Sequence, residues 1–221
     1  MPRPVHLVLS LLLGGGVVHA QPATPPALLD GLRLYVASFE PLPGETSLLA
    51  YARRETLEWT AFQNLYSVQV TDARAGTLDW RGHSATGGAS VFTTLRAATY
   101  AAGGKSLLVV NREWCMAGAC QTRTAFGWLD GGRLTAVKDT AVIPLIRDAD
   151  FYAGPVPPCL RGVTLNVSYL PARQGGALSV MAVAPRAAQV ACAQAGVAPE
   201  AVTRPLTLTW APGAGKFRKG W

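Results

Sequence analysis

Apolar and polar residues alternate along much of this chain, and glycine-containing turns interrupt the alternation. A period of two indicates strands with one buried face, and short glycine turns join antiparallel strands. Three hairpins are predicted, each given as strand, turn and strand: Tyr66–Val70, 72–76 and Leu78–Trp80; Leu95–Tyr100, Gly103-Gly104 and Leu107–Asn111; Thr122–Leu129, 130–132 and Leu134–Lys138.

Other segments are predicted as single strands, and one as a helix. The strands are expected at 32–39, 163–169, 177–184 and 206–210. Arg186–Ala195 is rich in alanine and is followed by Gly196, which is typical of a helix and its end. Residues 45–62 fit both helical and strand spacing, and the strands that follow them favour strand.

These elements predict an all-β fold of antiparallel hairpins, arranged as a sandwich or a barrel-like sheet, with one short helix near the C-terminal end. No repeat of about 40–45 residues recurs, so a regular propeller is not supported. We expect a flexible lead-in over 21–30 and a single β-rich domain over 31–221. Prolines at 155, 157 and 158 leave open a division into two lobes, 31–154 and 159–221.

The first twenty residues have the pattern of a secretory signal peptide. Arg3 precedes an apolar run over 7–18, and Val18-His19-Ala20 places small residues at the two outer positions of a cleavage site. The run is shorter than the roughly 20 residues that span a bilayer. The sequence therefore predicts a protein that is exported to the periplasm or the extracellular space and is soluble after cleavage at residue 20.

All four cysteines lie beyond this cleavage site, and an even number in an exported chain favours disulfides. Among the three possible pairings we favour Cys115–Cys120 with Cys159–Cys192, the second of which would pin the predicted helix to the sheet. The four residues between Cys115 and Cys120 do not match the two-residue spacing of thioredoxin-like redox sites or most zinc sites. No metal site and no cofactor is predicted.

The formal net charge is +7 and would fall to +6 after cleavage, because Arg3 is the only charged residue that is removed. The arginines are dispersed and follow no stripe, which argues against nucleic acid as a partner. One basic cluster remains, formed by Lys216, Phe217, Arg218 and Lys219. This segment is interpreted mainly as a frayed, solvated end, and as a candidate contact for an anionic surface such as an envelope polymer.

The usual catalytic residues are scarce. His83 is the only histidine after residue 20, and its neighbour Ser84 is poorly placed to pair with it in a catalytic triad. No catalytic residue is assigned. Four carboxylates support an alternative, an exported hydrolase acting for example on glycans: Glu55, Glu58, Asp148 and Asp150.

The favoured hypothesis is an exported, disulfide-stabilised, non-enzymatic module that binds a partner or has a structural role in the cell envelope. Its partner would be an envelope polymer or another exported protein. The two hypotheses differ in a spatial expectation: a hydrolase needs two of its carboxylates about 5–10 Å apart in one pocket.

Overall fold

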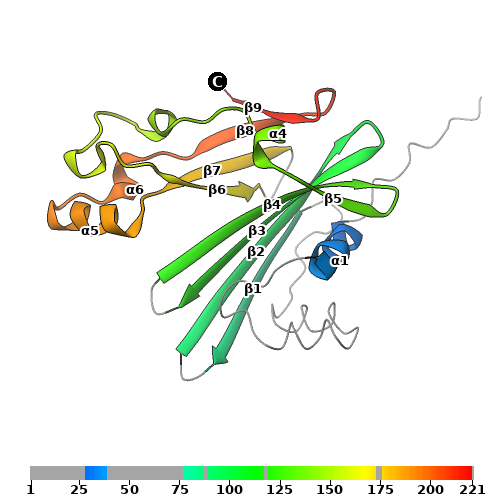
Figure 1. The fold of residues 1–221 in the computed structure, drawn as a ribbon, viewed down its shortest axis with the longest axis horizontal. Coiled ribbons are helices and arrows are strands. Elements are labelled where there is room, and N and C mark those ends of the chain that lie inside the picture. The colour runs from blue at the N-terminus through cyan, green and yellow to red at the C-terminus, as the bar shows by residue number, and fades with distance from the viewer. Residues whose placement is uncertain (1–27, 39–76, 87–88, 117–118, 173–175, 221) are drawn as a thin grey trace, which may run out of the picture.

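The computed structural model describes residues 28–38, 77–86, 89–116, 119–172 and 176–220. These residues form two antiparallel sheets and several short helices (Figure 1). The first sheet contains, in spatial order, β1 (Thr77–Thr86), β2 (Ala89–Ala102), β3 (Lys105–Met116), β4 (Ala119–Asp130) and β5 (Arg133–Val137). The second contains β6 (Asn166–Pro171), β7 (Ala177–Val183), β8 (Leu206–Ala211) and β9 (Lys216–Lys219). The helices are α1 (Leu28–Ser38), α4 (Asp139–Val142), α5 (Arg186–Gln194) and α6 (Pro199–Val202), with 3-10 turns η2 (Asp148–Phe151) and η3 (Pro158–Leu160).

The glycine turns explain the order of the first sheet. Gly103 and Gly104 have φ angles of 53° and 86°, and they connect β2 to β3 as a two-residue turn. A turn with two positive φ angles matches the right-handed twist of paired strands, and glycine adopts it without a steric penalty. The turn Gly131-Gly132 between β4 and β5 has the same character. Both hairpins predicted from these turns are therefore confirmed.

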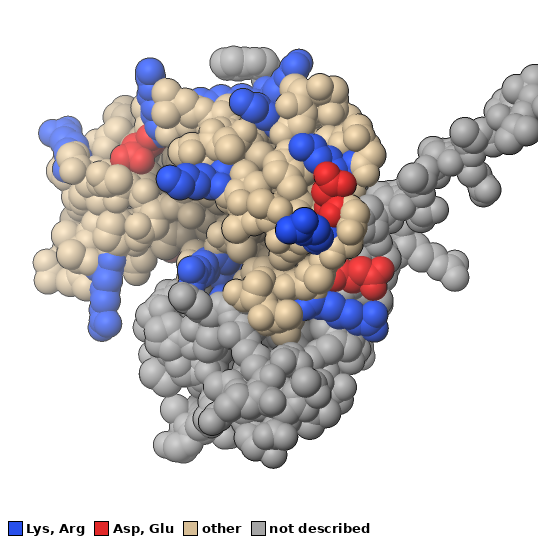
Figure 2. Space-filling model, turned by 45° about the vertical axis from the view of Figure 1, so that its right-hand side comes forward, with Lys and Arg blue, Asp and Glu red and all other residues tan. Residues whose placement is uncertain are grey.

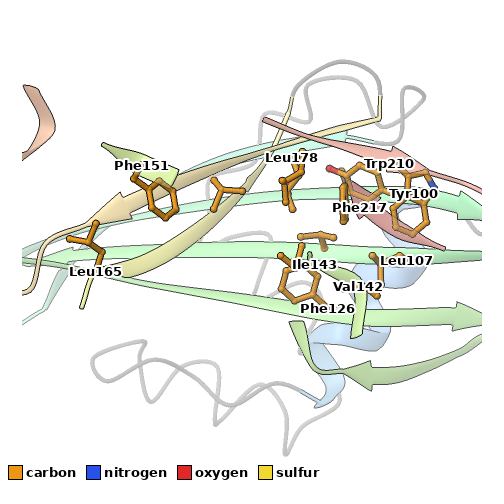
Figure 3. Close-up of a cluster of buried hydrophobic side chains, with 14 of the residues drawn as sticks. Tyr100, Leu107, Phe126, Val142, Ile143, Phe151, Leu165, Leu178, Trp210 and Phe217 are labelled. Carbon is orange, nitrogen blue, oxygen red and sulfur yellow. The ribbon is translucent and has the colours of Figure 1, made fainter. Parts of the chain in front are cut away.

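The two sheets pack against each other through a shared apolar core. Along β3, Leu107 and Val109 point into this core, where they join Leu178 of β7 and Leu208 of β8. Figure 3 shows the cluster between the two layers of strands. It includes residues from both segments 31–154 and 159–221.

An aromatic group fills one end of this core. Trp210 packs against Tyr100 and Phe217, with ring centroids 5.6 Å and 4.9 Å away (Figure 3). Its Nε1 donates a hydrogen bond of 2.7 Å to the carbonyl oxygen of Ala101 on β2. The Tyr100 hydroxyl donates to the carbonyl oxygen of Ala177 at 2.9 Å, and its burial raises its pKa. The two sheets are thus joined by partly buried hydrogen bonds as well as by apolar contact.

Helix α1 covers the opposite face of the first sheet (Figure 1). Its buried residues Leu28, Leu32 and Val36 recur every four positions and pack on Leu108 and Val110 of β3. This finding corrects the strand predicted at 32–39. Leu and Val at 32, 34 and 36 also alternate, but the structure uses the four-residue spacing, which places three side chains on one helical face.

The predicted fold class is correct in its main part, since the described chain is mostly β and its strands are antiparallel. The prediction of a single helix is not confirmed, because α1, α4 and α6 form in addition to α5. The signal peptide, residues 45–62 and the predicted strand at 66–70 lie outside the described residues.

The predicted pairing of Cys159 with Cys192 is observed, with a Cα–Cα distance of 5.1 Å. It joins α5 to η3 rather than to a strand, because Cys159 lies within η3. Cys115 is also disulfide-bonded, and Cys120 stands directly opposite it in the register of β3 and β4. The side chain of Cys120 lies outside the described part of the chain.

Candidate functional site

The strongest candidate site is a cavity of about 380 Å³ between the C-terminal half of α1 and the outer face of the first sheet. Small-molecule sites in proteins typically have volumes of 300–1,000 Å³ and mainly apolar walls. The cavity is lined by Tyr35, Ser38, Leu108, Val110, Arg112, Arg123, Ala125, Phe126, Gly127, Leu134 and Ala136. Its size and lining therefore fit a small ligand.

Small residues on β4 and β5 create this space. Ala125, Gly127 and Ala136 occupy positions where larger side chains would fill the gap beneath α1. Gly127 is closely covered by Leu134, since a Cβ atom on Gly127 would lie 2.5 Å from a Leu134 methyl group. The strand alternation sends the rings of Phe126 and Trp128 toward the second sheet, so these two rings do not fill the space beneath α1.

Two arginines lie side by side at one end of the cavity. Arg112 of β3 and Arg123 of β4 are direct cross-strand partners, and both line the cavity. Arg112 is only 1% exposed, and its guanidinium carbon lies 5.8 Å from the centre of the Tyr35 ring. Each arginine has additional interactions, so neither is free of partners. The cavity thus combines apolar walls with a concentrated positive charge.

A second polar group lies on the other face of β3 and β4. The buried Asn111 amide nitrogen is within 3.0–3.2 Å of the hydroxyl oxygens of Thr122, Thr124 and Ser168. The Thr122 and Ser168 hydroxyls are 3.1 Å apart. An amide does not act as a general base, and these bonds satisfy polar atoms between the first sheet and β6. The group therefore has the character of a structural junction.

The basic C-terminal segment is ordered. Lys216–Lys219 forms β9 and pairs with β8, so its interpretation as a frayed end is wrong. Phe217 is 2% exposed and belongs to the core, whereas Lys216 and Arg218 are exposed. In the face of the molecule that Figure 2 shows, Lys and Arg are spread over the described residues. Contact with an anionic surface remains a prediction, and it would depend on these two exposed side chains.

Two of the four carboxylates named for a hydrolase, Asp148 and Asp150, lie in η2. The Lys219 Nζ donates a hydrogen bond of 2.6 Å to Asp150, and the backbone N–H of Arg147 donates another of 2.8 Å. These bonds, led by that from Lys219, hold the pKa of Asp150 below its usual value. A general acid needs a raised pKa, so Asp150 is unsuited to that role. Glu55 and Glu58 lie outside the described residues.

The Asp150–Lys219 pair gives a testable pH dependence. Because folding lowers the pKa of Asp150, its contribution is present above the unfolded-state value of about 3.9 and is lost as pH falls through the lower folded-state value. Asp150→Asn should reduce the free energy of unfolding by up to about 1 kcal/mol at pH 7, as expected of a partly exposed ion pair. Urea unfolding from pH 7 to pH 2 measures this difference.

The difference between wild type and Asp150→Asn should shrink as the pH approaches 2. The neighbouring substitution Asp148→Asn is the control, since the hydrogen bond between Lys219 and Asp150 stays intact. A difference that stays constant across the pH range would show that the ion pair does not contribute.

Other predicted features can be placed in the described chain. His83 lies in β1, opposite Phe92 of β2, and its side chain is outside the described part. No group of three His, Cys, Asp or Glu side chains suited to a metal ion occurs among the described residues. None of the helices in the described ranges is long and apolar enough to cross a bilayer.

The sequence analysis did not identify Arg112, Arg123 or Tyr35 as site residues. One signal was available, since a hairpin that pairs Cys115 with Cys120 also places Arg112 opposite Arg123. The position of α1 could not be inferred from a segment interpreted as a strand.

The chain matches no protein-family model, no curated protein and no solved structure.

Proposed function

We propose that this protein is an exported, non-enzymatic binding module that holds a small, largely apolar molecule in the cavity between α1 and the first sheet. The observation that carries the proposal is the cavity itself, with its volume of about 380 Å³ and its wall of apolar side chains. The cavity opens to solvent, since Ser38, Arg123 and Ala136 in its lining are exposed. Its volume and its largely apolar lining are those of small-molecule sites, and this supports an occupant.

Export is supported by the pattern of residues 1–20 and by the disulfide between Cys159 and Cys192, which suits an oxidising compartment. The hydrolase alternative has less support, because the ionised form of Asp150 is stabilised by Lys219 and Arg147. Binding requires no such acid, and the cavity lining offers apolar contact instead.

The proposal predicts that the purified protein binds 1-decanol, a neutral probe with one apolar chain. Ala136 lines the cavity and is exposed, so Ala136→Trp should obstruct the cavity without disturbing the core. We expect this substitution to weaken decanol binding at least tenfold, measured by isothermal titration calorimetry.

Thr135→Trp is the matched control, since Thr135 is an exposed neighbour that does not line the cavity. It should leave the affinity unchanged. Circular dichroism establishes that both variants are folded. If neither decanol nor an anionic chain of the same length binds, or if both substitutions weaken binding equally, the cavity is not the binding site.

A further inference from the structure

We infer that the ligand of this cavity carries an anionic oxygen head group, which Arg112 and Arg123 bind, and an apolar tail, which lies beneath α1. The inference rests on the proposed function, because it assumes that the cavity is a binding site. It adds the chemical class of the ligand: a carboxylate or phosphate on an aliphatic chain.

The register of the first sheet arranges the cavity wall in rows. Arg112 is opposite Arg123, Val110 is opposite Ala125, and Leu108 is opposite Gly127, which in turn is opposite Ala136. Successive rows are two residues apart along the strands, so about 13 Å separates the first from the third. The wall therefore changes from cationic to apolar along one direction.

The arginine row has an unusual charge arrangement. Like charges placed directly opposite each other on one face of a sheet are destabilising, and Arg112 is 99% buried as well. None of the described residues that line the cavity is acidic. Both arginines line the same end of the cavity, and the N–H donors of their guanidinium groups suit anionic oxygens, which indicates the polarity of the head group.

The existing partners of the two arginines do not exclude this role. Each guanidinium has five N–H donors in a planar fork, which suits carboxylate and phosphate oxygens. An anion would add to or displace the interactions that Arg112 and Arg123 already make. The Tyr35 ring packs near the Arg112 guanidinium and helps to orient it.

The apolar rows specify the rest of the ligand. Leu108, Val110 and Ala125 have only hydrocarbon side chains, and Leu134 closes the same region from β5. A small inorganic anion would make no use of this apolar part of the lining. An aliphatic chain attached to the head group would contact them while the head group stays with the arginines.

The test compares decanoate and decyl phosphate, each below its critical micelle concentration, with 1-decanol below its solubility limit, by isothermal titration calorimetry. The chains are equal, so the comparison isolates the head group. We expect at least one of the two anions to bind tenfold or more tightly than decanol, and the tighter anion identifies the head group. Raising the salt concentration should reduce this preference, because ions screen partly exposed charges.

Arg123→Gln removes one charge at an exposed position and should abolish most of the preference for the anion, measured as the ratio of anion affinity to decanol affinity in the same variant. Arg133→Gln is the control, since Arg133 is an exposed arginine of β5 that does not line the cavity. Equal affinity for decanol and both anions would overturn the inference and leave the proposed function standing. Failure of all three probes to bind would overturn the proposed function itself.

Discussion

Replacing Trp210 by alanine should lower the free energy of unfolding by about 3–5 kcal/mol, the range measured for large aromatic residues in protein cores. Trp210 is 8% exposed and lies where the two sheets meet. The substitution removes its ring contacts with Tyr100 and Phe217 and leaves the carbonyl oxygen of Ala101 without the indole donor. Because these contacts connect β2, β8 and β9, both sheets should lose stability together.

Denaturant unfolding followed by circular dichroism measures this loss. Trp210→Phe retains much of the ring but not the hydrogen bond, so it should have a smaller effect than alanine. Thr209→Ala is the matched control, because Thr209 is the exposed neighbour on the other face of β8 and its loss should change stability by less than about 0.5 kcal/mol. A loss below 1 kcal/mol for Trp210→Ala would contradict the assigned role of the aromatic cluster.

The hairpins could be predicted because their determinants are local. Gly103-Gly104 and Gly131-Gly132 need positive φ angles, and the strands on either side of each turn alternate in polarity. Once a two-residue turn is placed, antiparallel register follows from symmetry about it. The information required for β2–β3 and β4–β5 thus lies within about twenty residues of each turn.

Helix α1 could not be predicted in this way. Its apolar positions fit both a period of two and a spacing of four, and the segment is too short for one pattern to dominate. Packing on Leu108 and Val110, more than seventy residues further along, favours the helix. Gly31 allows α1 to approach the sheet closely, since a Cβ atom at this position would lie 2.6 Å from a Leu129 methyl group.

The candidate site depends both on local turn signals and on contacts between residues far apart in the sequence. The pairing of Arg112 with Arg123 follows from the hairpin register, but the cavity exists only because α1 lies over β3, β4 and β5. Sequence analysis that assigned a strand to the α1 segment had no element to form the roof. Phe217 could not be recognised as a core residue from the basic segment around it, because its aromatic partners Tyr100 and Trp210 come from β2 and β8.

Removing the disulfide between Cys159 and Cys192 should cost about 3–4 kcal/mol of stability. The two residues are 33 positions apart, and a cross-link of that span reduces the conformational entropy of the unfolded chain by about this amount. Cys192 is fully buried, so alanine is the appropriate replacement, and the double variant Cys159→Ala/Cys192→Ala leaves no unpaired thiol at these positions. Urea unfolding of wild type and variant measures the difference.

The predicted bond between Cys115 and Cys120 provides a comparison within the same chain. It would close only a short hairpin loop, so its removal by Cys115→Ala/Cys120→Ala should cost less, about 2 kcal/mol. The order of these two losses tests the entropic argument, because the longer loop must give the larger effect. Equal losses, or a larger loss for the hairpin pair, would mean that native-state packing around the sulfur atoms decides the stability instead. In that case the variant with the larger loss of stability should also unfold faster. Native packing that is absent from the transition state stabilises only the folded protein, so its removal raises the unfolding rate.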